Sequence, residues 1–378
     1  KHAAMHVEGG VIKAIGPEAE VLKIASQPFE EIDCHNRVVL PGLIESHTHT
    51  VFAGSRSDEF ERRLQGESYQ DIARLGGGIL STVQATRKTS YAELQTLSQR
   101  RAQRFLSQGV TTLEVKSGYA LNLDDEVKML EVARSLQGPK IVSTFLGAHA
   151  IAPEHQTAEE YLHWLAQSVL PIIEQKKLAT RVDIFVENGY FNSQIAKPYL
   201  QAAQKIGFDV VVHADQLSLS GGADLAIELG ARSADHLLQI SQTQVKQLAN
   251  SNVTCGLLPA ADLYMKSVYP QARALIDQGA RVALASDFNP GSSPTQDISL
   301  VGLLARLEMK MSWAEVLCAY TLGAAYALGV ETQCGSLSPG KKADFIVVED
   351  EAHDLFYQAG QSPVVETWVE GERKNILT

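Results

Sequence analysis

Hydrophobic positions along the chain form short, nearly continuous apolar runs that alternate with longer stretches of helical periodicity. Stretches typical of amphipathic helices span residues 91–107, 124–136, 158–174, 193–205 and 241–250. The apolar runs, rich in β-branched residues and typical of buried parallel strands, span residues 38–49, 110–116, 140–149, 181–187, 209–213, 233–238, 253–258 and 282–287. Eight strands that alternate with helices over about 250 residues predict an α/β fold of the (β/α)8 TIM-barrel type.

The two ends of the chain carry a different pattern. Residues 5–20 place a Gly-Gly pair between two short strand-like runs, which predicts a β-hairpin. Residues 340–348 and 364–374 are also short and strand-like, with a Glu-Gly turn in the second segment. We therefore expect residues 1–40 and 339–378 to form the two parts of one small β-sandwich domain, beside a barrel that spans residues 41–338.

The composition of the chain limits which kinds of molecule the protein can bind. The chain of 378 residues has a net charge of −11, which argues against nucleic acid and against an anionic membrane surface. No apolar run approaches the roughly 18 residues of a membrane span, and no secretory signal is visible. The four cysteines are widely separated, as in proteins that keep reduced thiols. These features predict a cytoplasmic protein that acts on a small molecule.

Ionisable side chains recur at the carboxyl ends of the predicted strands, where a (β/α)8 barrel carries its chemistry. His47 and His49 end the first run, and positions two apart on a strand face the same side. His149, His213 and Asp287 end later runs, and His236 lies within the sixth. Three histidines and one aspartate form a ligand set that suits zinc or iron(II) with one position open to water.

Each of these residues, taken alone, also has an ordinary structural interpretation. His213 follows three valines and could be a core histidine, and Asp287 could be a turn or capping residue. Arg56 could lie on the surface, and Tyr119 could simply pack. Their shared position at the same end of separate strands favours the metal-site hypothesis. In that hypothesis Asp287 also accepts the proton of the attacking water, and His236 stabilises the water or the developing oxyanion.

This arrangement resembles the amidohydrolase superfamily, and the resemblance covers essentially the whole chain. It is carried by the segment PGLIESHTH at 41–49, by the later histidines and Asp287, and by GSLSPGKKADF at 335–345. Glu45 departs from the aspartate more common there, although a carboxylate is retained. Binuclear members carry a carboxylated lysine after the fourth strand, where residues 185–188 here read FVEN. The resemblance therefore implies one zinc or iron ion per subunit, held by His47, His49, His213 and Asp287.

Longer motifs resemble the imidazolonepropionase family of that superfamily. They are HTHTVFAGSR at 47–56, GGGI at 76–79, EVKSGY at 114–119, LGAH at 146–149, HADQ at 213–216 and SDFNPGS at 286–292. The resemblance implies hydrolysis of the cyclic amide of 4-imidazolone-5-propanoate to N-formimidoyl-L-glutamate, in L-histidine degradation, by a homodimer. The residues that it places at the substrate are Arg56, Tyr119, His149, Gln216, Asn289, Gly291 and Ser292.

The motif residues carry distinct expectations. Arg56, in the first loop after a barrel strand, suits a bidentate contact with the substrate's carboxylate. Gln216 cannot act as a general base, which moves that role to Asp287 and His236. Residues 76–78 are expected to form a flexible active-site loop, and Lys116 is expected to be an ordinary charged residue with a partner. Two rivals stay open: a deaminase of the cytosine or guanine type, and a non-enzymatic metal-binding scaffold on the same fold.

Overall fold

The computed structural model describes residues 3–25, 28–68, 71–72, 75–349 and 351–374. A parallel sheet of eight strands lies at its centre, in the sequential order β4 to β11. Its strands are β4 (Leu43–Glu45), β5 (Val110–Lys116), β6 (Lys140–Ala148), β7 (Arg181–Val186), β8 (Asp209–Ala214), β9 (Ser233–His236), β10 (Thr254–Leu257) and β11 (Val282–Leu284). Just past β4 and β11, Thr48 and Phe288 form a parallel bridge that brings the first and last strands together. The predicted (β/α)8 barrel is confirmed.

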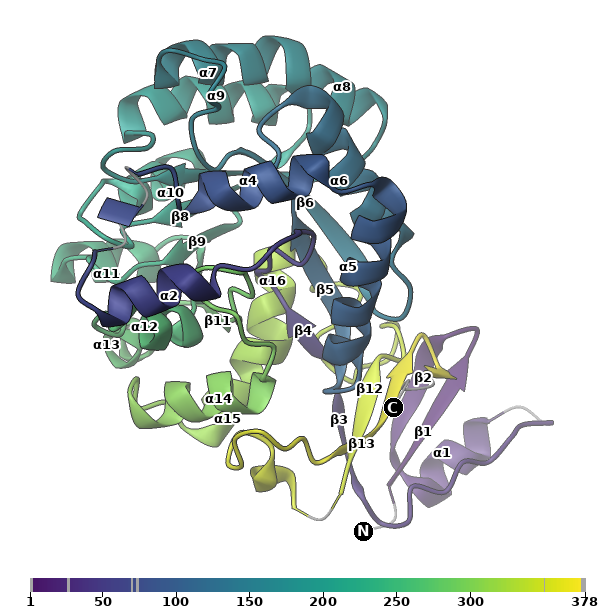
Figure 1. Cartoon of the computed structure of the whole chain (residues 1–378). Coiled ribbons are helices and arrows are strands. Elements are labelled where there is room, and N and C mark those ends of the chain that lie inside the picture. Colours follow the sequence, from purple (N-terminus) through teal and green to yellow (C-terminus); the bar gives the residue numbers. More distant parts are fainter. Residues whose placement is uncertain (1–2, 26–27, 69–70, 73–74, 350, 375–378) are drawn as a thin grey trace.

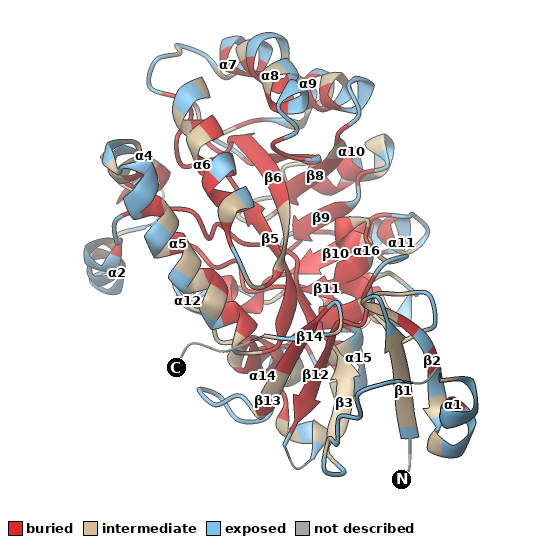
Figure 2. Ribbon diagram, turned by 90° about the vertical axis from the view of Figure 1, so that its right-hand side faces the viewer, coloured by how far each residue is buried: buried red, intermediate tan, exposed pale blue. Residues whose placement is uncertain are grey.

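Helices surround the strands (Figure 1). The barrel strands are mostly buried, and the exposed residues lie on the outer helices and the loops (Figure 2). The five predicted helical stretches are confirmed as α5 (Tyr91–Leu106), α6 (Leu123–Ser135), α7 to α8 (Ala158–Trp164, Leu170–Gln175, joined by a π-turn), α9 (Ser193–Lys205) and α11 (Gln242–Ala249). Polar N-cap residues explain where they begin. The side chains of Ser90, Asn122 and Thr157 each accept a hydrogen bond from the backbone N–H three residues on, which satisfies an otherwise unpaired donor.

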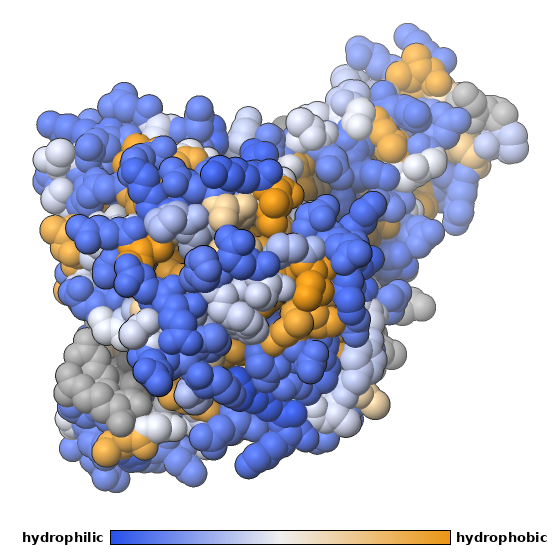
Figure 3. Space-filling model, turned by 90° about the horizontal axis from the view of Figure 1, so that it is seen from above, coloured by the Kyte–Doolittle hydropathy of each residue, from blue (hydrophilic) through white to orange (hydrophobic). Residues whose placement is uncertain are grey.

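Further helices complete the outer layer. They are α2 (Ser57–Leu64), α4 (Ile79–Lys88), α10 (Gly222–Leu229), α12 (Pro259–Met265), α13 (Ala272–Asp277), α14 (Ile298–Leu307), α15 (Trp313–Cys318) and α16 (Ala324–Leu328). Within the described residues, no helix combines the length and the apolar character that crossing a membrane requires. The face in Figure 3 is largely hydrophilic, with apolar residues in separate small patches.

The first apolar run differs from the prediction, because residues 38–49 do not form one strand. β3 (Val38–Pro41) pairs antiparallel with β12 (Phe345–Val348), outside the barrel, and β4 begins only after Gly42. Gly42 is required at this change of sheet, since a Cβ there would lie 2.3 Å from Thr111 Oγ1. Continuous hydrophobicity shows that a segment is buried, but it does not show in which sheet. His47 and His49 consequently follow the barrel strand and do not lie on it.

A small β-region built from both ends of the chain lies beside the barrel (Figure 1). One sheet has the order β14-β13-β12-β3, with β13 (Val364–Val369) and β14 (Glu372–Arg373) joined by the expected Glu-Gly turn. The predicted hairpin is also present, as β1 (Ala3–Glu8) and β2 (Val11–Pro17) around Gly9 and Gly10, whereas residues 18–20 begin α1 (Glu18–Ile24). The proposed domain boundaries, after residues 40 and 338, stay a proposal. Strand β3 ends at Pro41, one residue beyond the first of these boundaries.

Candidate metal centre and active-site pocket

Five ionisable side chains from four segments meet at the carboxyl end of the barrel. His47, His49, His213, His236 and Asp287 are all buried. Nε2 of His47 and Nε2 of His49 lie 3.5 and 3.4 Å from Asp287 Oδ1. The ring centroid of His213 lies 4.5 Å from the ring centroid of His47 and 5.3 Å from that of His236. The structure therefore brings together the four predicted ligands, with His236 against them.

Two carboxylates that the sequence analysis did not single out orient the histidines. Asp235 Oδ2 lies 2.7 Å from Nδ1 of His47, and Asp183 Oδ1 lies 3.0 Å from Nδ1 of His213. The Nε2 atoms of both rings are buried and have no hydrogen-bond partner among the described residues. Histidine ligands of metals typically donate their other ring N–H to a carboxylate. The orphaned Nε2 atoms and the neighbouring Asp287 oxygen thus fit one metal ion.

Burial and charge give the histidines different protonation preferences. Burial lowers the pKa of His49 to about 4 and that of His236 to about 3, so both rings present a lone pair at neutral pH. Burial lowers the pKa of His47, but the hydrogen bond with Asp235 and the nearby carboxylate of Asp287 outweigh burial and raise the pKa to about 9. The pKa of Asp287 lies well below its usual range: burial opposes ionisation, but the imidazoles of His47 and His49 beside its carboxylate overcome this.

A buried ion network lies beneath the histidines. Lys116 Nζ lies 2.8 Å from Asp183 Oδ2 and 2.9 Å from Glu114 Oε1. Glu114 Oε2 accepts a hydrogen bond from the backbone N–H of Thr48, the residue between the first two histidines. Lys116 is therefore a charged residue with partners, as expected. It connects the His47–His49 segment with Asp183, the partner of His213.

Glu45, the residue that departs from the superfamily pattern, connects the first and last strands. Its carboxylate accepts hydrogen bonds from the backbone N–H of Ser286, at 3.1 and 3.2 Å, one residue before Asp287. Burial raises its pKa to about 8. The backbone at Asp287 and at His236 has positive φ, 53° and 80°, which is uncommon for residues other than glycine and recurs at functional sites.

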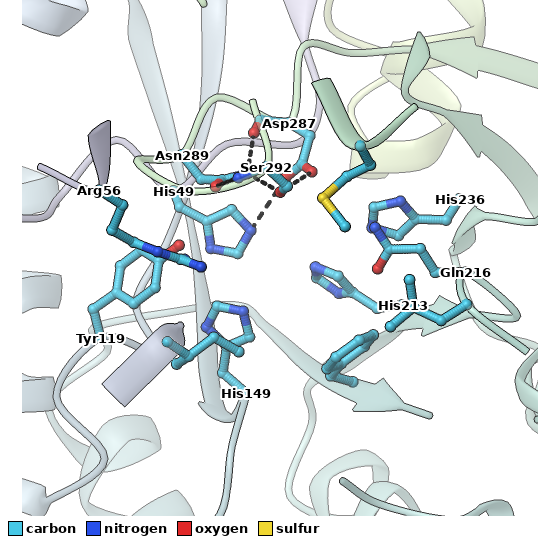
Figure 4. Close-up of a pocket in the computed structure, with 14 residues that line it drawn as sticks. His49, Arg56, Tyr119, His149, His213, Gln216, His236, Asp287, Asn289 and Ser292 are labelled. Atoms are coloured by element: carbon cyan, nitrogen blue, oxygen red, sulfur yellow. Dashed lines mark hydrogen bonds and ion pairs between the residues drawn. The ribbon is translucent and has the colours of Figure 1, made fainter. Parts of the chain in front are cut away.

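A pocket lies among these side chains, with His49, His149, His213 and His236 in its wall (Figure 4). Fourteen residues line it, ten of them polar or ionisable and four apolar: His49, Arg56, Tyr119, His149, His213, Gln216, His236, Asp287, Asn289 and Ser292, with Ile79, Phe185, Leu217 and Met265. Six of the seven predicted substrate residues are in this lining. The seventh, Gly291, lies against Arg56: a Cβ there would lie 2.0 Å from Nη1, so only glycine lets the guanidinium occupy its position.

The predicted substrate residues differ in how far their polar atoms are already engaged. His149 stacks on His49 at 4.9 Å between centroids, and its Nδ1 lies 3.1 Å from Gly118 O. Asn289 Nδ2 donates to Asp287 O and to Ser292 Oγ, while its Oδ1 accepts from the N–H groups of Gly291 and Ser292. The amide of Asn289 thus organises the loop after Asp287, and a contact with substrate would replace one of these bonds.

Asp183 and Asp235 had a detectable signal in the sequence. Both are carboxylates inside buried, largely apolar strand runs, at 181–187 and 233–238, where an unpartnered charge would be costly. Their partners could not be assigned from spacing, because Asp235 meets a histidine 188 positions away.

Comparisons with known proteins agree with this geometry. The model of the Amidohydrolase family matches residues 72–373. An imidazolonepropionase of Bdellovibrio bacteriovorus is 53% identical over 96% of this chain and 86% of its own, and one of Bacillus cytotoxicus is 44% identical over 97% and 88%. Among solved structures, a zinc-bound adenosine deaminase from Xanthomonas campestris has a TM-score of 0.75 at 19% identity, covering 99% of this chain and 88% of that one. Guanine deaminase from E. coli has a TM-score of 0.74 at 16% identity, covering 98% and 94%.

Proposed function

Because the chain belongs to the imidazolonepropionase family of amidohydrolases, we propose that it hydrolyses the cyclic amide of 4-imidazolone-5-propanoate to N-formimidoyl-L-glutamate. One observation carries the proposal: the pocket places a metal-ligand set and a buried arginine at the same mouth. The ligand set suits attack of water on a ring carbonyl. The arginine suits the carboxylate tail of the same substrate.

In this proposal His47, His49, His213 and Asp287 hold one zinc or iron(II) ion. When bound, the ion supplies Lewis acidity, which makes water a better nucleophile at neutral pH and polarises a carbonyl. The geometry around His47 and His213 supports this role, since Asp235 and Asp183 keep both Nε2 atoms aimed at the centre. Lys116 is engaged by two carboxylates, which supports a single ion over a lysine-bridged pair.

We assign the proton transfer to Asp287 and the stabilisation of water to His236, because their charge states suit these roles. Asp287 is held ionised, so it can accept the proton of the attacking water and deliver it to the ring nitrogen that leaves. His236 is held neutral by burial and lies beside Asp287, where it can hydrogen-bond the water or the developing oxyanion. Gln216 lines the same pocket but has no basic atom, so we assign it substrate binding.

The tail of the substrate is an anion, and Arg56 is the one arginine or lysine among the described residues that line the pocket. Arg56 therefore has to supply the local positive charge, and its guanidinium extends into the pocket near Tyr119 (Figure 4). We propose that Tyr119 and His149 contact the ring, with Asn289, Gly291 and Ser292 forming the opposite wall. A deaminase of the cytosine or guanine type acts on a neutral base and needs no such arginine.

The variant Arg56→Ala separates these possibilities. We expect it to raise KM for 4-imidazolone-5-propanoate by roughly 30-fold or more, because a charge-assisted bidentate contact is worth about 2–5 kcal/mol when one partner is removed. Loss of the ring chromophore measures turnover, and release of ammonia from cytosine and guanine measures deamination. Arg37→Ala, which removes a surface arginine paired with Glu349, is the control. The deaminase function would replace this proposal if the parent protein opened no ring and if Arg56→Ala still released ammonia from cytosine or guanine.

Three finer expectations stay proposals: a homodimer, a cytoplasmic location, and zinc or iron as the ion. Sedimentation equilibrium tests the first, and fractionation of the source cells tests the second. Elemental analysis of protein purified without added metal tests the third, with one equivalent of zinc or iron expected per chain.

A further inference from the structure

The arginine of the pocket is itself held by a carboxylate that does not line the pocket. Arg56 is the N-cap residue of α2, and Glu59 lies one helical turn further on. Arg56 Nε donates to Glu59 Oε2 at 2.8 Å, and the two side chains are only 4% and 14% exposed. Water therefore competes weakly for this ion pair, which fixes the guanidinium from its Nε side.

The second oxygen of Glu59 binds a different segment. Oε1 accepts a hydrogen bond from the backbone N–H of Gly78 at 2.9 Å and from Ser81 Oγ at 3.0 Å. Gly78 is the N-cap residue of α4, with a φ of 69°, and the next residue, Ile79, lines the pocket. A Cβ at Gly77 would lie 3.0 Å from Glu59 Oε1, so the glycine segment packs closely on this carboxylate.

Glu59 thus joins two predicted parts of the active site, the arginine and the segment 76–78. Gly291 closes the other side of the guanidinium, where a Cβ would lie 2.0 Å from Nη1. An arginine held in this way loses little further side-chain freedom when a ligand binds. Its Nε–H is used by Glu59, while the fork formed by Nη1 and Nη2 is the part of a guanidinium that pairs with a second carboxylate end-on.

We propose that Glu59 is a positioning and specificity-determining residue. It holds Arg56 and the start of α4 in one arrangement, and so makes the pocket select ligands that carry a carboxylate tail. This inference rests on the proposed function for the identity of the ring, but not for the preference for an anionic tail. The chain offers a matched control on the same segment: Arg62 and Glu67 also form an ion pair, half exposed and with neither residue in the pocket lining.

Kinetics with paired substrates test the proposal. We compare 4-imidazolone-5-propanoate with its propanamide, which keeps the ring and loses the charge. Glu59→Gln is expected to raise KM for the acid about tenfold, since a hydrogen bond to a charged group contributes about 1.5–3 kcal/mol, with kcat within about twofold. KM for the amide is expected to be unchanged, and Glu67→Gln is expected to change neither value. A purely structural role would instead affect both substrates alike.

A binding measurement separates this inference from the proposed reaction. Calorimetry with 3-(imidazol-4-yl)propanoate and its amide needs no turnover, and Glu59→Gln should erase most of the acid's advantage. If the parent protein opens no ring but shows this pattern, the reaction fails and the role of Glu59 stands. Equal weakening of acid and amide, or an equal effect of Glu67→Gln, would overturn the role of Glu59.

Ser81→Ala keeps the test decisive if Glu59→Gln does not fold. It removes one hydrogen bond to Glu59 and keeps the charge. We expect a two- to threefold rise in KM for the acid alone, in line with a net value of about 0.5–1.5 kcal/mol for a neutral donor. No change for the acid, with the fold intact by circular dichroism, would count against the proposal.

Discussion

The interior of the small β-region and the carboxyl end of the barrel are both shielded from solvent, but they bury different kinds of side chain. The β-region packs apolar side chains: Ile12 and Val347 are buried, and the rings of Phe345 and Trp368 stack at 5.2 Å. The barrel end packs Lys116, Asp183 and five histidines at similar depth. One interior is held by hydrophobic contact, and the other depends on every charge having its partner.

This difference assigns the two regions different tasks. Burying apolar area contributes about 25 cal/mol per Å² and needs no particular orientation. Burying ions costs several kcal/mol each, and their pairing often does no better than restore that loss. The barrel end therefore adds little net stability, and its order serves to aim Nε2 atoms at one point. Substitutions in the two regions should separate activity from stability.

The largest expected effect is on turnover, at Asp287. Asp287→Asn removes a proposed metal ligand and the proton acceptor together, so kcat should fall by about 10³-fold or more, since general-base catalysis alone contributes about 10²–10⁴-fold. The matched control is Asp344→Asn in the small β-region, where a buried carboxyl accepts from Glu370 N and burial raises its pKa. That variant should keep kcat. Steady-state kinetics with elemental analysis measures both, and equal losses of kcat would erase the contrast between the regions.

A mixed effect is expected at Asp183, which serves both the ion network and His213. Asp183→Asn leaves Lys116 with Glu114 and replaces the acceptor at His213 Nδ1 by an amide. Metal affinity should fall by about 10–100-fold, and the free energy of unfolding should fall by about 1.5–3 kcal/mol, because buried Lys116 loses one of its two carboxylate partners. Chelator competition and urea denaturation measure these quantities. An unchanged metal affinity would mean that Asp183 does not orient His213.

The smallest effect on activity is expected in the small sheet. Trp368→Ala removes the ring that stacks on Phe345 and should lower the free energy of unfolding by about 3 kcal/mol. The value of kcat/KM should stay within about twofold at temperatures well below the melting point, since no group at the metal centre moves. A large fall in kcat/KM of the folded variant would show that the two regions are coupled.

Most of the fold and the residues of the site were predictable because they depend on local pattern. The alternation of apolar runs with amphipathic stretches located the barrel, and the carboxyl ends of those runs located His149, His213 and His236. The prediction failed at residues 38–49, because a buried run carries no information on which sheet it joins. β11 is also shorter than the apolar run suggests, so Asp287 lies three residues beyond its end.

The sequence by itself determined which donor atoms are available and at which end of the barrel they lie, since strand period and burial follow from residue type and spacing. Only the tertiary structure decided which groups meet. Asp235 reaches His47 across 188 positions, Thr48 pairs with Phe288 at the barrel seam, and Glu59 joins Arg56 to Gly78. These contacts arise from closure of the barrel and from loop packing, where distance along the chain no longer limits distance in space.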